Sequence, residues 1–174
     1  MRIRNLMTFL VACAASFGAA AAPSIAVIED APWSPGDASR EGAAEFEVLV
    51  RLAQLQQQQP LVGFVGLGDR RGIFQEGTRR GLEFAVRQGV PVVRLSRGAS
   101  RAVPVDTDIF IDGGSMSPAA AAALLARCLE RFGPLPVLAS TRSLSSQNAD
   151  ELRSKLRLYQ AEFTARQSAM IAMN

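Results

Sequence analysis

The chain has 174 residues, with 19 lysines and arginines against 16 aspartates and glutamates, and it contains no histidine. The absence of histidine excludes Ser-His-Asp triads, Cys-His dyads and histidine-ligated metal sites. With 48% hydrophobic residues the chain has enough apolar material for one compact core, and its composition does not indicate disorder.

Residues 1–21 are predicted to be a secretory signal peptide. Arg2 and Arg4 make the start positive, an apolar run follows at 6–18, and small residues then lead to a cleavage position after Ala21. The apolar run is shorter than the roughly 20 residues of a membrane span. The LVAC stretch that ends at Cys13 has the form of a lipoprotein box, so lipidation of Cys13 is the alternative. We expect an exported, periplasmic or secreted protein without a membrane span.

Cleavage of this signal would change the charge and the cysteine count. Without Arg2 and Arg4, 17 basic residues remain against 16 acidic ones, which leaves a net charge of +1. Nucleic-acid binding normally needs a concentrated basic face, so no nucleic-acid partner is predicted. Cys128 would be the remaining cysteine, which precludes an internal disulfide. Its apolar helical neighbours predict a place in the core.

Short apolar runs and helical patterns alternate along the rest of the chain. Strands are predicted at residues 24–28, 61–65, 90–95 and 108–112. Helices are predicted at about residues 40–55, 73–88, 118–132 and 148–163. Nearly all-apolar strands in the order βαβαββαα favour an α/β fold, a three-layer sandwich whose small, mostly parallel sheet is flanked by helices. We expect one domain over residues 23–163 and a tail at 164–174.

Local signals predict where the last two helices begin and end. Ser117 is a candidate N-cap, followed by proline at the first helical position, and Gly133 is expected to stop that helix. Asn148 and Glu151 are spaced as a capping box for the final helix. The side chains expected to be buried on the first of these helices are Leu125, Leu129 and Phe132.

In parallel sheets, ligands bind at the loops that leave the carboxyl ends of the strands. The candidate ligand-binding residues in these loops are Glu29, Asp30, Gly66, Gly68, Asp69, Arg70, Arg71, Ser96 and Arg97. A further such loop is expected at 112–115. The glycines at 66–72 are spaced G-x-G-x-x-x-G, which differs from the dinucleotide fingerprint, and Arg94 stands near the end of the next strand where an acid is expected. The sequence therefore favours a tight glycine turn, and no cofactor or metal is predicted.

Three stretches in order resemble the C-terminal domain of the bacterial-type L-asparaginase and glutaminase family. They are GLGDRRG at 66–72, QGVPVVRLSRG at 88–98 and DGGSMSPAAAAALLARCLERFG at 112–133. The resemblance extends over about residues 23–163. It implies that the nucleophilic threonine and its Thr-Lys-Asp support belong to a larger N-terminal domain, which we do not find in this chain. Lys155 is the one lysine, and Thr107, between Asp106 and Asp108, is expected in a solvated loop. No catalytic residue is predicted.

The resemblance also shows where this chain departs from the family. The family loop usually reads G-x-G-N-G-N, and its two asparagines fall on Asp69 and Arg71 here. The packing motifs are kept while the functional positions differ. This pattern indicates an exported, non-catalytic binding or subunit-association module for a small amino-acid-like ligand, a carboxylate or a partner protein.

Besides this module, two alternatives stay open. The chain is one component of an amidohydrolase that acts only with a separate catalytic chain, or it is a dispensable fragment of a once complete enzyme. A homo-oligomer or a catalytic partner chain is the possible protein partner. The basic residues Arg70, Arg71, Arg79 and Arg80 bind an anion or form a solvated helix face, and the sequence favours the solvated face.

Overall fold

The computed structural model describes residues 24–29, 46, 49–50, 53, 61–98, 109–138 and 146–172. Its elements are β1 (Ser24–Glu29), β2 (Leu61–Leu67), α2 (Glu76–Arg87), β3 (Val92–Leu95), β4 (Ile111–Gly114), α3 (Pro118–Phe132) and α4 (Ser146–Ala172). Phe46, Leu49, Val50 and Ala53 are helical and fall in the helix predicted between the first two strands. The predicted signal peptide, Cys13 and the Asp106–Thr107–Asp108 stretch lie outside the described residues.

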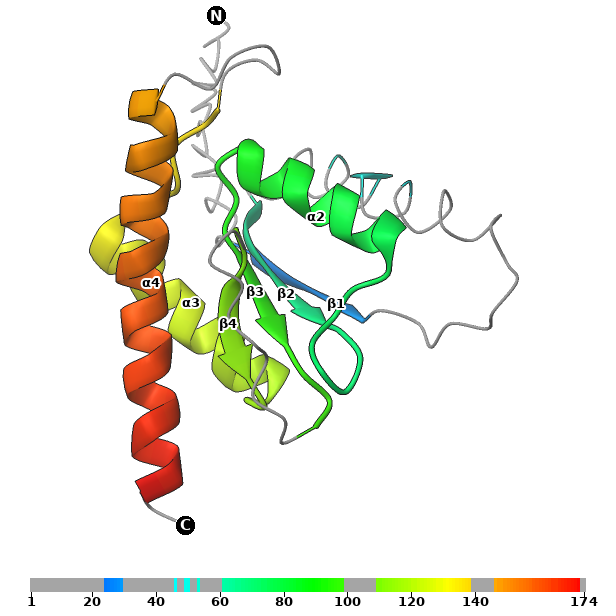
Figure 1. The fold of residues 1–174 in the computed structure, drawn as a ribbon, viewed down its shortest axis with the longest axis vertical. Coiled ribbons are helices and arrows are strands. Elements are labelled where there is room, and N and C mark those ends of the chain that lie inside the picture. The colour runs from blue at the N-terminus through cyan, green and yellow to red at the C-terminus, as the bar shows by residue number, and fades with distance from the viewer. Residues whose placement is uncertain are drawn as a thin grey trace, which may run out of the picture.

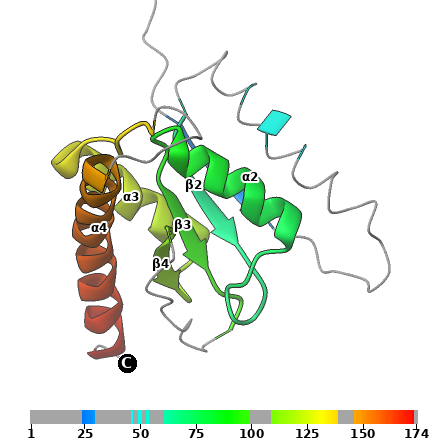
Figure 2. The same ribbon diagram turned by 45° about the horizontal axis from the view of Figure 1, so that its top comes forward.

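The four strands form one parallel sheet in the order β1-β2-β3-β4. Helix α2 lies across one face of the sheet, α3 lies across the other, and α4 stands beside β4 (Figure 1). The turned view in Figure 2 shows the same arrangement. The predicted α/β sandwich with a small parallel sheet is therefore confirmed.

Two glycines of β2 let the helices approach the sheet closely on both faces. A Cβ atom added at Gly63 would lie 2.6 Å from Leu125 Cδ2 of α3, and one added at Gly66 would lie 2.6 Å from Phe74 Cζ. Because residues of opposite parity point to opposite faces of a strand, Gly63 and Gly66 serve different faces. Gly66, predicted as a ligand-binding residue, lies inside β2 and its missing side chain makes room for the Phe74 ring.

The ends of α3 follow the sequence signals. Ser117 is the N-cap, and its Oγ accepts a hydrogen bond from Ala120 N at 3.3 Å. Gly133 ends the helix with φ 73°, a left-handed conformation that favours glycine. Leu125 is fully buried, as predicted, whereas Leu129 and Phe132 are only partly buried. Phe132 belongs to the last turn of α3, where it packs beside the Tyr159 ring of α4.

Several predicted boundaries are wrong. β4 runs from Ile111 to Gly114, so Asp112, expected at the strand end, lies within the strand. Helix α2 begins at Glu76, three residues later than predicted, because the loop before it folds back on itself. Helix α4 begins at Ser146, ahead of the predicted capping box, and continues to Ala172 through most of the segment set apart as a tail.

Contacts with β4 explain why α4 is so long. The Asp112 N–H donates to Gln160 Oε1 at 2.8 Å, and the Asp112 carbonyl accepts from Gln167 Nε2 at 2.9 Å. These two glutamines take the place of a further strand along this edge of the sheet, where unpaired backbone groups would otherwise face water or another chain. None of the helices in the described ranges is long and apolar enough to cross a membrane.

Candidate functional site

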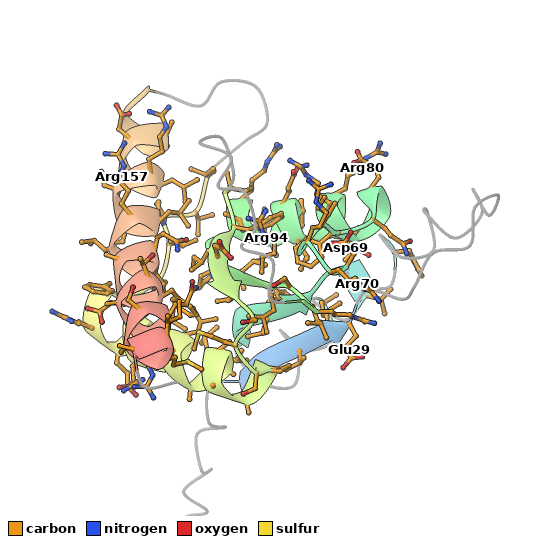
Figure 3. The ribbon with its side chains drawn as sticks, turned by 60° about the horizontal axis from the view of Figure 1, so that its bottom comes forward. Glu29, Asp69, Arg70, Arg80, Arg94 and Arg157 are labelled. Carbon is orange, nitrogen blue, oxygen red and sulfur yellow. The ribbon has the colours of Figure 1, made fainter. Side chains whose placement is uncertain are left out.

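The carboxyl ends of the strands bring most of the predicted site residues together. Glu29 ends β1, the loop at 68–72 follows β2, and Ser96 and Arg97 follow β3. Glu29, Asp69 and Arg70 lie in one region of the side-chain view, away from Arg157 on α4 (Figure 3). Asp30, the remaining predicted residue of this group, lies outside the described residues.

The loop after β2 is closed by its own aspartate. Asp69 Oδ1 accepts hydrogen bonds from the backbone N–H groups of Arg71 and Ile73, each at 2.8 Å. The Asp69 N–H donates to the Ile73 carbonyl at 3.1 Å, and Gly72 N donates to the Asp69 carbonyl at 3.1 Å. A carboxylate of the protein thus occupies the position where backbone N–H groups would otherwise receive an external anion.

The loop glycines are required by this closure. A Cβ atom on Gly68 would lie 2.6 Å from the backbone carbon of Gly72, which is too close for any side chain. Gly72 itself has φ 78°, a left-handed conformation that costs energy for other residues. The turn therefore explains Gly68 and Gly72, whereas Gly66 is explained by its contact with the Phe74 ring.

The loops after β2 and β3 are joined by backbone hydrogen bonds. Arg97 N donates to the Asp69 carbonyl at 3.0 Å, and Gly68 N donates to the Leu95 carbonyl at 3.0 Å. Ser96 is buried, and its hydroxyl donates to the Gly98 carbonyl at 2.9 Å. Ser96 therefore holds the second loop in shape and does not present its hydroxyl to solvent.

The charged side chains of this edge include one ion pair and two arginines on the loop after β2. Arg97 Nη2 lies 4.0 Å from Glu29 Oε2, and this exposed pair contributes at most about 1 kcal/mol to stability. Arg70 and Arg71 are exposed on the loop. Their guanidinium groups, together with the Glu29 carboxylate, are the groups here that could hold the two ends of an amino acid.

Two arginines of α2, Arg79 and Arg80, are paired within the helix. Arg79 binds Glu83 at 2.7 Å and Arg80 binds Glu76 at 2.9 Å, each four residues away. Pairs at this spacing are typical of a solvated helix face. A solvated face stays the interpretation that the sequence favours for these two arginines.

Three further groups that could act as a base or a nucleophile lie elsewhere, between α3 and α4: Lys155, Tyr159 and Cys128. The Lys155 ammonium donates to the Phe132 carbonyl, and the Tyr159 hydroxyl donates to the Gly133 carbonyl at 2.6 Å. Burial raises the pKa of Tyr159 from 10.0 to about 12, and the neighbouring Cys128 adds to the increase. Burial and then Glu162 raise the pKa of Cys128 from 9.0 to about 11, so this thiol is protonated and a poor nucleophile at neutral pH.

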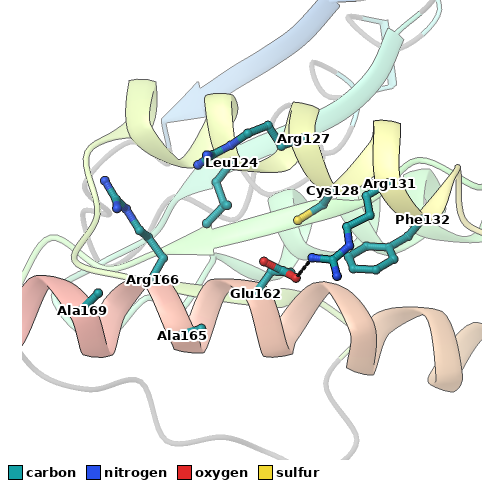
Figure 4. Close-up of a pocket in the computed structure, with 9 residues that line it drawn as sticks. All are labelled: Leu124, Arg127, Cys128, Arg131, Phe132, Glu162, Ala165, Arg166 and Ala169. Atoms are coloured by element: carbon teal, nitrogen blue, oxygen red, sulfur yellow. Dashed lines mark hydrogen bonds and ion pairs between the residues drawn. The ribbon is translucent and has the colours of Figure 1, made fainter.

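A concave feature lies between α3 and α4, and the sequence interpretation missed it. This groove, about 380 Å³ in volume, is lined by Leu124, Arg127, Cys128, Arg131, Phe132, Glu162, Ala165, Arg166 and Ala169 (Figure 4). Two of its basic residues, Arg127 and Arg131, lie four positions apart on α3, which was the available signal. Only the packing of α3 on α4 places Arg166 of α4 opposite them.

No cluster of three or more histidine, cysteine or acidic side chains suited to a metal ion occurs in the described part of the chain. Comparison with protein-family models finds no match, and comparison with curated proteins finds none either. The functional conclusion therefore depends on the geometry and on the sequence resemblance.

Proposed function

We propose that this chain is an exported, non-catalytic α/β module, similar to the C-terminal domain of the bacterial-type L-asparaginase and glutaminase family. Its role is to bind a small amino-acid-like ligand or to associate with a partner subunit at the carboxyl edge of the sheet. The observation that carries this proposal is the Asp69 carboxylate, which accepts hydrogen bonds from two backbone N–H groups of the loop after β2.

The chemistry of the described residues supports a non-catalytic role. Covalent catalysis requires a nucleophile within hydrogen-bond reach of a base that activates it. Lys155, Cys128 and Tyr159 instead serve the contact between α3 and α4, where two of them hold carbonyl groups at the end of α3. At the carboxyl edge, Ser96 is buried and bound to a carbonyl group.

The exposed charges of the carboxyl edge support recognition of a zwitterion. Arg70 and Arg71 extend from a loop held rigid by Asp69, and Glu29 ends the neighbouring strand. Arginine is suited to carboxylates because its planar guanidinium group can donate two parallel hydrogen bonds. The Glu29 carboxylate would accept from an amino group.

The second candidate function is that of a component in an L-asparaginase or glutaminase-type amidohydrolase that acts only with a separate catalytic chain. The loop at 68–72 favours it, because the resembling family uses this loop to complete a neighbouring active site. In this chain that loop is well ordered by its own hydrogen bonds and presents Arg70 and Arg71 outward.

Two measurements on the mature chain test the proposal. We expect no ammonia release from asparagine or glutamine above the buffer control, and steady release by the chain alone would overturn the non-catalytic assignment. In calorimetry, aspartate and glutamate are expected to bind the mature chain, and Arg71→Ala is expected to weaken that binding. Arg87→Ala, which removes an exposed arginine from the last turn of α2, is the matched control. If Arg71→Ala binds these ligands as well as the wild type does, the loop is not part of the binding site.

A further inference from the structure

The groove between α3 and α4 has an apolar floor. Leu124 and Cys128 of α3 form part of it and are almost fully buried. On the α4 side the lining residues Ala165 and Ala169 are small and exposed, so their short side chains leave the groove open. A floor of this kind can accept apolar side chains from another molecule.

The rim of the groove is cationic. Arg131 forms an ion pair with Glu162, and its guanidinium carbon lies 5.1 Å from the centre of the Phe132 ring. Arg127 and Arg166 are exposed and come from opposite helices toward the same end of the groove (Figure 4). No described carboxylate lies within ion-pair distance of either of them. With three arginines and one glutamate, the groove has a formal charge of +2.

This charge decides which occupant fits. A second copy of the chain placed groove to groove would bring two +2 surfaces together, which is unfavourable because like charges face each other. An acidic occupant neutralises Arg127 and Arg166 and leaves the Arg131–Glu162 pair intact. Met170 and Ile171, in the last turn of α4, are also exposed.

We propose that the α3–α4 groove is a docking surface for an acidic, amphipathic segment of a partner protein. The apolar side chains of the segment would lie on Leu124, Cys128 and the two alanines, and its carboxylates would bind Arg127 and Arg166. A helix laid into an open groove between two helices is a common mode of recognition. This inference rests on the proposed role in association, but it concerns a different face from the carboxyl edge.

Fluorescence anisotropy with two labelled peptides tests the charge requirement. The probes are a helical peptide of leucine and glutamate and its counterpart with lysine in place of glutamate. The mature wild type is expected to bind the glutamate peptide, with weaker binding as salt rises. In the Arg127→Glu, Arg166→Glu double variant this affinity should fall at least about tenfold and the lysine peptide should bind instead. Arg157→Glu, an exposed arginine of α4 outside the groove, is the matched control and should bind as the wild type does.

A second variant pair tests the apolar floor. Ala165→Trp fills the groove and should weaken binding of the glutamate peptide, whereas Ser168→Trp, at an exposed position that does not line the groove, should not. The proposal is overturned if the glutamate peptide does not bind, if both tryptophan variants behave alike, or if poly-glutamate binds as well as the amphipathic peptide. Binding to anionic phospholipid vesicles without binding to the peptide also overturns it. Release of ammonia by the chain alone would refute the proposed function. It would not affect the outcome of the peptide-binding experiment.

Discussion

Replacing Asp69 by alanine removes the carboxylate that closes the loop between β2 and α2. That carboxylate accepts two backbone hydrogen bonds, from Arg71 and Ile73, both at 2.8 Å. A hydrogen bond to a charged acceptor typically contributes about 1.5–3 kcal/mol, but water can replace it in an exposed loop, so both bonds together are expected to contribute about 1–2 kcal/mol. In a chain of this length each 1 kcal/mol changes the melting temperature by roughly 2–4 °C, which predicts a decrease of roughly 2–8 °C.

Thermal unfolding followed by circular dichroism measures this decrease. Asp69→Asn keeps a side-chain oxygen and is expected to lose about half as much stability as Asp69→Ala. Asp150→Ala removes an exposed carboxylate from an ion pair on α4 and is the control, with an expected change of at most about 0.5 kcal/mol.

Added acetate tests whether the loop of the alanine variant has become an anion site. Acetate should raise the melting temperature of Asp69→Ala more than that of the wild type, because only the variant has free loop N–H groups. If Asp69→Ala is as stable as the wild type, or if acetate stabilises both proteins equally, the reasoning is refuted.

Three further predictions concern α3, α4 and the sheet edge. Because burial raises the pKa of Tyr159 from 10.0 to about 12, its neutral form stabilises the fold by about 3 kcal/mol below pH 10, and this is lost as pH rises toward 12. In alkaline denaturation, the free energy of unfolding of Tyr159→Phe should therefore fall less steeply with pH over that range than that of the wild type. An equal slope in both proteins would contradict the increase in pKa attributed to burial. Gln160→Ala combined with Gln167→Ala should cost about 1–3 kcal/mol and speed hydrogen exchange at the Asp112 amide, whereas unchanged exchange would mean that α4 does not protect this edge. Ser117→Ala should lower the free energy of unfolding by about 1 kcal/mol in urea titration, while Ser117→Asp should retain it; equal losses in both variants would argue against the cap.

Local sequence patterns determined the elements and the sheet. Apolar runs fixed the strands because a strand of a covered parallel sheet is buried on both faces, as Phe64 and Val65 of β2 are. Ser117 and Gly133 marked the ends of α3 because capping depends on the residue itself and on the backbone groups next to it. The gathering of Glu29, Asp69 and Arg97 at one edge also followed from the sequence, since parallel strands end together.

Only the tertiary structure decided how those residues are used. The sequence placed Asp69 in a glycine turn, but it did not reveal that its carboxylate binds Arg71 and Ile73, because this depends on how the loop folds back. The C-terminal half of α4 is held by a hydrogen bond from Gln167 to a residue 55 positions earlier, which no local pattern contains.

The α3–α4 groove is likewise a product of packing. Arg127 and Arg166 come from different helices, and helical periodicity sets which residues share one face of a helix but not which helix lies opposite. Contacts between segments far apart in the chain depend on the rotation and position of whole helices, and those are set by the packing of the core.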